Sequence, residues 1–135
     1  MSLPRQLWFK DVGLCFVLGW DYSSDTLVVE LDVGLSPGHP EHKQPNPGEI
    51  GHFVRGVLAF RNVESINGLL AQENVRPALG ADGEPDYDEV HCLCSDDMRT
   101  FYLEGEFGEV WLVSESPQLE LVDSGWTTRA VPDDR

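Results

Sequence analysis

The sequence predicts a mainly β fold, either an antiparallel β-sandwich or a flattened barrel, with at most one short helix. Its 135 residues, of which 41% are hydrophobic, suffice for one domain with a buried core. Short apolar stretches recur between clusters of Gly, Pro, Asn and Asp, a spacing typical of all-β domains. We therefore expect a single β domain over residues 1–124 and a loose C-terminal tail over residues 125–135.

The strand prediction is strongest for residues 26–33, where apolar and acidic side chains alternate. Alternation with period two is typical of an antiparallel strand that buries one face. The side chains expected to face inward are Leu27, Val29, Leu31 and Val33, and those expected to face outward are Glu30 and Asp32. The other predicted strands are 12–20, 53–60, 86–94, 99–104 and 109–115, with a short edge strand at 119–122.

Turn and loop signals separate these strands. Residues 95–98 and 105–108 are expected to close two hairpins. Segment 62–75 fits either a strand with a tight turn at Asn67–Gly68 or one face of a short helix, and we favour the strand. Residues 36–51 contain four prolines, which exclude a helix or a central strand and predict a long loop.

Three of the four histidines, His39, His42 and His52, lie in or beside this long loop. Imidazole is a common zinc ligand, but the spacing matches no ligand pattern, so we predict no metal site. Trp20 and Trp111 lie in predicted strands, and we expect both in the core. In an alternative hypothesis the histidine loop covers a small-molecule or metal site at the mouth of the domain, lined by these tryptophans.

No pattern in the sequence identifies a catalytic residue or a cofactor. Gly34–Gly38 matches the G-x-S-x-G pattern of hydrolases, but Pro37 lacks the backbone N–H that the oxyanion hole requires. Three cysteines, Cys15, Cys92 and Cys94, are too few for a secreted disulfide framework and indicate a reducing cytoplasm. Cys92 and Cys94 share one strand face but supply only two of the four ligands of structural zinc, so we interpret them as core residues.

Negative charge dominates the composition, with 24 Asp and Glu against 9 Lys and Arg and a net charge of −15. This charge excludes affinity driven by nucleic-acid phosphates and disfavours anionic membranes. Residues 82–123 hold thirteen acidic residues and one basic residue, Arg99, and so carry −12 of the total. Such a surface attracts a basic protein, or else it serves only solubility. The residues predicted to contact a basic partner are Asp86, Asp88, Glu104, Glu106 and Glu109.

One segment, residues 53–66, carries a resemblance to known proteins. It contains the pattern G-x-L-x-F-x-x-V, formed by Gly56, Leu58, Phe60 and Val63. Together with the preceding strand 25–31, it resembles small bacterial all-β families, some of which belong to the immunity proteins of polymorphic toxin systems. The resemblance implies a non-enzymatic cytoplasmic protein that occupies the positively charged cleft of a basic enzyme such as a nuclease, and it identifies no catalytic residue.

Overall fold

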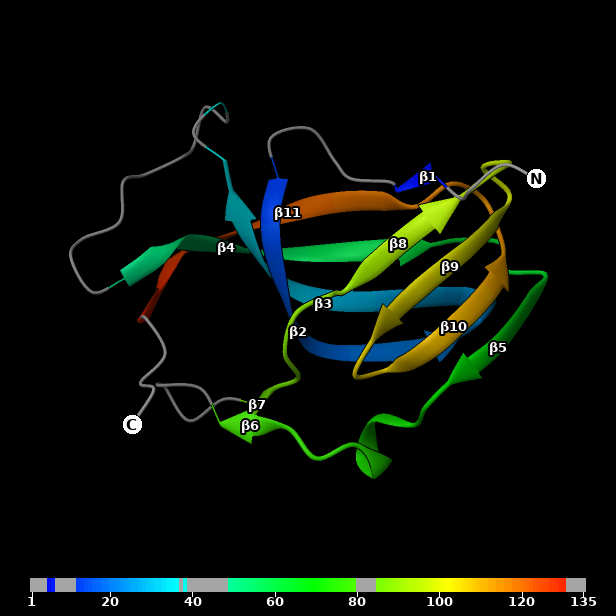
Figure 1. Ribbon diagram of the computed structural model, residues 1–135, viewed down its shortest axis with the longest axis horizontal. Coiled ribbons are helices and arrows are strands. Elements are labelled where there is room, and N and C mark those ends of the chain that lie inside the picture. The colour runs from blue at the N-terminus through cyan, green and yellow to red at the C-terminus, as the bar shows by residue number, and fades with distance from the viewer. Residues whose placement is uncertain (1–4, 7–11, 37, 39–48, 80–84, 131–135) are drawn as a thin grey trace.

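The computed structural model describes residues 5–6, 12–36, 38, 49–79 and 85–130, and it places most of them in two antiparallel sheets packed face to face (Figure 1). The five-stranded sheet has the strand order β1-β8-β9-β10-β5, and the four-stranded sheet has the order β11-β4-β3-β2. The predicted mainly β fold is confirmed. Because neither sheet closes on itself, the architecture is the sandwich and not the barrel.

The strands of each layer come from separate parts of the chain. The five-stranded sheet contains β1 (Arg5–Gln6), β8 (Cys92–Ser95), β9 (Thr100–Gly105), β10 (Gly108–Val113) and β5 (Ser65–Leu69). The four-stranded sheet contains β11 (Gln118–Ala130), β4 (Glu49–Phe60), β3 (Thr26–Leu35) and β2 (Val12–Ser23). A small third sheet pairs β6 (Ala78–Leu79) with β7 (Pro85–Asp86), and η1 (Gln72–Asn74) is a single 3-10 turn. No helix in the described ranges has the length and hydropathy needed to cross a membrane.

The core lies between the two sheets and forms one continuous cluster. In β3 the predicted inward set is confirmed, with Leu27, Val29, Leu31 and Val33 each at most 2% exposed. Of the two residues expected to face outward, Glu30 is exposed, but Asp32 is buried at 7% exposure and forms an ion pair with Arg55. In the opposing sheet, the inward side chains are Leu93, Phe101, Leu103, Val110 and Leu112. Phe60 and Phe101 meet across the interface with ring centroids 5.8 Å apart in an edge-to-face arrangement.

Both predicted hairpins are present. Residues 96–99 join β8 to β9, and residues 106–107 join β9 to β10. Phe107 in the second turn is completely buried, and Gly108 follows with φ +116°, a conformation that favours glycine. The buried turn residue anchors the end of this hairpin to the core.

The ambiguous segment 62–75 is a strand, β5, followed by η1. The tight turn expected at Asn67–Gly68 is wrong, because both residues lie within β5. Gly68 has φ +92°, and a Cβ atom there would lie 2.0 Å from the carbonyl oxygen of Glu109. Gly68 therefore allows the backbone of β5 to lie very close to that of β10 at an irregularity of the β5–β10 pairing. It does not form a hairpin turn.

The predicted strand 86–94 is divided between the two layers. Residues 87–90 run beside β2, where the N–H groups of Tyr87 and Val90 donate to the carbonyl oxygens of Val17 and Cys15. The chain then crosses to the five-stranded sheet as β8. Asp88, within the stretch beside β2, adopts a positive φ of 69°.

The predicted edge strand 119–122 belongs to the longer β11, which pairs with β4 up to Ala130. The strand therefore enters the segment 125–135 for which the sequence predicts a loose tail, and residues 131–135 lie outside the described residues. The long loop predicted for residues 36–51 also falls mostly outside them, except that β4 already begins at Glu49.

We expect the Phe60–Phe101 contact to be a main source of stability. Substituting either residue with alanine should lower the free energy of unfolding by about 3–5 kcal/mol, because each ring is fully buried and leaves a cavity. The double variant should reveal a coupling of about 0.5–1.5 kcal/mol from the edge-to-face contact. Denaturant unfolding measures both values. Tyr22→Ala, which removes an exposed ring, is the control and should cost about 0.5 kcal/mol or less, and an equal loss in this control would contradict the assignment of the core.

Candidate functional site

The outer face of the five-stranded sheet carries a patch of aromatic, acidic and thiol side chains. Phe101 and Leu103 of β9 point into the core, so the residues between and beyond them point outward. The same alternation in β10 turns Val110 inward and its neighbours outward. We call this surface the outer patch, and its members are Cys92, Cys94, Tyr102, Glu104, Glu109 and Trp111.

Strand register arranges the outer patch in two rows. Cys94, Tyr102 and Trp111 lie opposite one another on β8, β9 and β10. Cys92, Glu104 and Glu109 form the second row in the same way. Directly opposite side chains on neighbouring strands are close enough to interact, so the register by itself creates an aromatic pair and a carboxylate pair.

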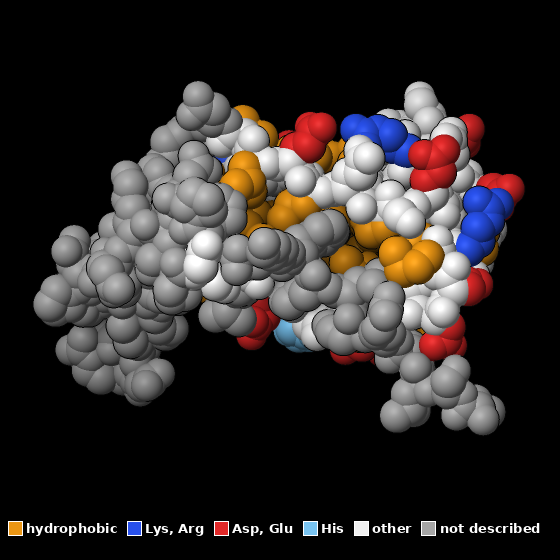
Figure 2. Space-filling model, turned by 90° about the horizontal axis from the view of Figure 1, so that it is seen from above, with side chains coloured by type: hydrophobic (Ala, Val, Ile, Leu, Met, Phe, Trp, Pro, Cys, Tyr) orange, Lys and Arg blue, Asp and Glu red, His pale blue; other side chains and the backbone are white. Residues whose placement is uncertain are grey.

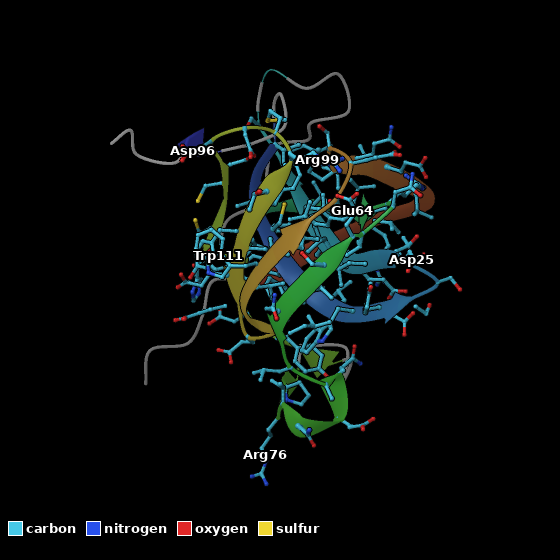
Figure 3. All side chains as sticks on the ribbon, turned by 90° about the vertical axis from the view of Figure 1, so that its right-hand side faces the viewer. Asp25, Glu64, Arg76, Asp96, Arg99 and Trp111 are labelled. Atoms are coloured by element: carbon cyan, nitrogen blue, oxygen red, sulfur yellow. The ribbon has the colours of Figure 1, made fainter. Side chains whose placement is uncertain are left out.

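The aromatic pair joins a half-buried tyrosine to an exposed tryptophan. The rings of Tyr102 and Trp111 lie with centroids 4.6 Å apart and an interplanar angle of 39°. Trp111 is 52% exposed, and Figure 3 shows it on the side of β10 that faces away from the four-stranded sheet. The expectation that Trp111 is a core residue is therefore wrong. The alternation Glu109-Val110-Trp111-Leu112 contains the signal that could have placed it outside, because Val110 and Leu112 are the buried positions.

The other strand tryptophan, Trp20, is a core residue as predicted, with 8% exposure. Its ring meets those of Tyr87 and Phe107 edge to face, and its indole N–H donates to the carbonyl oxygen of Leu70 at 2.8 Å. Because Trp20 is in the core and Trp111 is on the outer patch, the two do not line one binding site. A pocket beside Trp20 is lined by Leu18, Gly19, Trp20, Asp21, Val28, Glu30 and Gln72.

The carboxylate pair consists of Glu104 and Glu109. Glu104 accepts a hydrogen bond from the hydroxyl of Tyr102 at 2.7 Å. This hydrogen bond, together with burial and the charges of Glu104 and Glu109, raises the pKa of Tyr102 well above its ordinary value. Among the described residues, no Lys or Arg side chain forms an ion pair with either glutamate. Like charges directly opposite on two strands repel, so the pair favours the approach of an external cation.

The structure brings together three of the five residues predicted to bind a partner. Glu104, Glu106 and Glu109 all lie at the β9–β10 hairpin, and Glu106 and Glu109 are exposed. Asp88 is exposed on the crossing segment beside β2. Asp86 lies in β7, and its side chain is outside the described part of the structure.

Other acidic residues of the run 82–123 make local contacts instead. Glu115 accepts a hydrogen bond from the side-chain amide of Asn62. Glu64, which lies before this run, pairs with its single basic residue, Arg99, and Figure 3 shows the two side by side at one end of the sheet. Acidic and basic side chains also lie near each other on the face seen in Figure 2. The net negative charge therefore does not make every surface acidic.

The side chains of the three histidines predicted for the alternative ligand site lie outside the described part of the structure. His39 and His42 lie outside the described residues, and of His52 only the backbone, in β4, is described. Within the described ranges, no three His, Cys, Asp or Glu side chains form a cluster that could hold a metal ion. The ligand-binding hypothesis therefore stays a prediction.

The cysteines lie in two environments. Cys92 and Cys94 share the outer face of β8, as the strand period predicts, and their Sγ atoms are 2.6 Å apart. Both cysteines were predicted to be core residues. Cys94 is buried, at 8% exposure, although it lies on the outer face of the sheet, whereas Cys92 is only half-buried. Cys15 is buried in the core cluster, and this burial raises its pKa to about 12.

Comparison with known proteins adds no relative: no family model, no curated protein and no solved structure matches the chain. The functional argument therefore depends on the geometry of the outer patch.

Asp97, in the turn before β9, has a structural role that can be measured. Its carboxylate accepts backbone N–H bonds from Thr100 at 2.7 Å and Arg99 at 2.9 Å, and these bonds lower its pKa below the ordinary 3.8. A lowered pKa in the folded state gives stability that is complete well above pH 3.8 and is lost as the pH falls through the lowered value. We expect Asp97→Ala to unfold at lower denaturant concentration at pH 7, with a difference from wild type that disappears in acid.

Asp96→Ala is the matched control, because Asp96 is an exposed neighbour in the same turn. Unfolding midpoints measured from pH 2 to pH 7 (about the range in which carboxylates titrate) separate the two variants. Equal effects of both substitutions at every pH would contradict the capping role of Asp97.

Proposed function

We propose that this protein is a binding protein that engages a basic protein partner through the outer patch. The single observation that carries the proposal is the contact of the exposed Trp111 with the half-buried Tyr102, beside the paired carboxylates of Glu104 and Glu109. A guanidinium or ammonium group can lie over an aromatic face and donate to a carboxylate at the same time. The outer patch offers both interactions within two neighbouring rows.

The composition of the outer patch also resembles that of protein interfaces. Exposed tryptophan and tyrosine are enriched at the energetic centres of such interfaces, where they bury a large area with little loss of conformational freedom. The carboxylates of the β9–β10 hairpin add a negative field that accelerates the approach of a positively charged partner. Together these features favour a basic protein over a neutral one.

The cytoplasmic, immunity-like function implied by the sequence resemblance is one form of this proposal. It requires a basic enzyme whose positively charged cleft receives the outer patch, and whose activity falls on binding. The geometry of the outer patch supports recognition of a cationic surface and is independent of which enzyme provides it.

The charge component is tested with defined probes, fluorescently labelled peptides rich in arginine or in lysine. The site variant combines Glu104→Lys, Glu106→Lys and Glu109→Lys. The control variant combines Glu30→Lys, Glu73→Lys and Glu120→Lys, all exposed positions away from the outer patch. Each substitution adds two positive charges, so both variants change the net charge from −15 to −9.

At low salt we expect the site variant to bind the peptides about tenfold or more weakly than the control variant, a difference of about 1.4 kcal/mol. Binding by the wild type should weaken as salt rises from about 50 mM to about 500 mM, because exposed charges are screened. Fluorescence anisotropy measures both effects. An equal loss of affinity in the two variants would mean that only net charge matters, and it would contradict the proposed site.

The aromatic component is tested without changing charge. Trp111→Ala should weaken binding of the arginine-rich peptide by about 1 kcal/mol or more, because it removes the ring over which the guanidinium stacks. Trp111→Phe retains a ring and should recover part of the affinity. If both variants bind as the wild type does, the tryptophan is not part of the site, whatever the carboxylates contribute.

A further inference from the structure

The geometry of the two thiols on β8 suggests a chemistry that is independent of partner binding. Cys92 and Cys94 flank Leu93, whose side chain is completely buried in the core, so both thiols point away from the core on the same face. Their Sγ atoms are in contact at 2.6 Å. Two residues of strand advance about 6.6 Å, and disulfides span Cα separations of up to about 6.8 Å. Because the sulfur atoms are already in contact and the expected Cα separation lies within this range, a bond between them is geometrically accessible.

We propose that Cys92 and Cys94 form a reversible intrastrand disulfide by exchange with low-molecular-weight disulfides such as glutathione disulfide. Cys92 is the more exposed of the two and is the attacking residue, whereas Cys94, at 8% exposure, is the resolving residue. The contact between the sulfur atoms gives the second step the advantage of an intramolecular reaction.

The exchange balances in two steps. In the first, the Cys92 thiol loses its proton and attacks one sulfur of glutathione disulfide, whose S–S bond breaks as one glutathione thiolate leaves. In the second, the deprotonated Cys94 sulfur attacks the Cys92 sulfur of this mixed disulfide and expels the other glutathione thiolate. The protein loses two electrons and two protons, and glutathione disulfide gains them to become two glutathione thiols.

The same geometry indicates a labile bond and not a permanent structural one. The Cα separation expected across the pair is near the upper end of the range for disulfides, and strained or exposed disulfides are the ones most easily reduced. Burial, the neighbouring Cys94 thiol and the Glu104 carboxylate raise the pKa of Cys92 to about 12, so its thiolate is scarce at neutral pH and exchange is expected to be slow. Slow exchange affects the time needed to reach equilibrium and not the position of that equilibrium.

The test is a redox titration of the full-length protein. The folded chain is equilibrated in mixtures of reduced and oxidised glutathione, quenched with acid, alkylated after denaturation, and examined by intact mass and peptide mapping. We expect the reduced protein to carry an alkyl group on each of its three cysteines. The product of oxidising mixtures should carry one alkyl group and be lighter by the other two groups and by about 2 Da more, the two hydrogen atoms lost when a disulfide forms. Mapping should then find Cys92 and Cys94 joined and Cys15 alkylated, and reducing mixtures should restore all three thiols.

Single variants distinguish a pair from independent thiols. Cys92→Ser and Cys94→Ser should each lose the intramolecular bond and accumulate at most one bound glutathione at the remaining thiol of β8. Cys15→Ser is the matched control and should keep the bond, because Cys15 lies in the core cluster and takes no part in the exchange. The wild-type peptide map does not depend on how well any variant folds.

Three outcomes would overturn the proposal. The wild type could carry glutathione at both Cys92 and Cys94 without a bond between them. Mapping could join Cys15 to one of the two. The third is that both thiols persist at every glutathione ratio in the folded protein, while the denatured chain oxidises under the same conditions.

Discussion

The burial of one face of each sheet against the other is the constraint on which the rest of this structure depends. The core is one cluster shared by both layers, and rings such as Phe60 and Phe101 meet across it. Because successive side chains of a strand point to opposite faces, every residue held in the core determines the direction of its neighbours. Leu103 and Val110 are fully buried, and this is why Glu104 and Trp111 lie on the outer face.

The register of the β9–β10 hairpin determines which outward side chains lie next to one another. Phe107 is buried within the turn, and Gly108 supplies the positive φ with which β10 begins. These features fix Tyr102 opposite Trp111 and Glu104 opposite Glu109. A shift of one residue would send the outer side chains into the core, so the stability of the sandwich also maintains the outer patch.

Negative charge in this protein serves more than one purpose. Asp97 caps a turn through backbone hydrogen bonds, and Glu64 pairs with Arg99. Glu104 and Glu109 instead face each other on adjacent strands, next to the contact of Tyr102 with the exposed Trp111. The combination of repelling carboxylates and an exposed tryptophan is the reason that we propose a binding role for the outer patch. Cys92 and Cys94 stand at the β8 end of the same two rows, and the redox chemistry that we propose for them is separate from partner binding.

The sequence by itself determined the mainly β class, the alternation of β3, both hairpins of the β8–β10 meander and the shared face of Cys92 and Cys94, because turn residues and the period of two are local properties. Only the tertiary structure decided that segment 86–94 divides between the two sheets. It also decided that Gly68 lies where the backbones of β5 and β10 come very close. The exposure of Trp111, by contrast, follows from the local alternation, because Val110 and Leu112 take the core positions on either side of it. Which carboxylates meet depends on the register of the β9–β10 hairpin; the residue pattern predicted the turn, but the burial of Phe107 within it was decided by the tertiary structure.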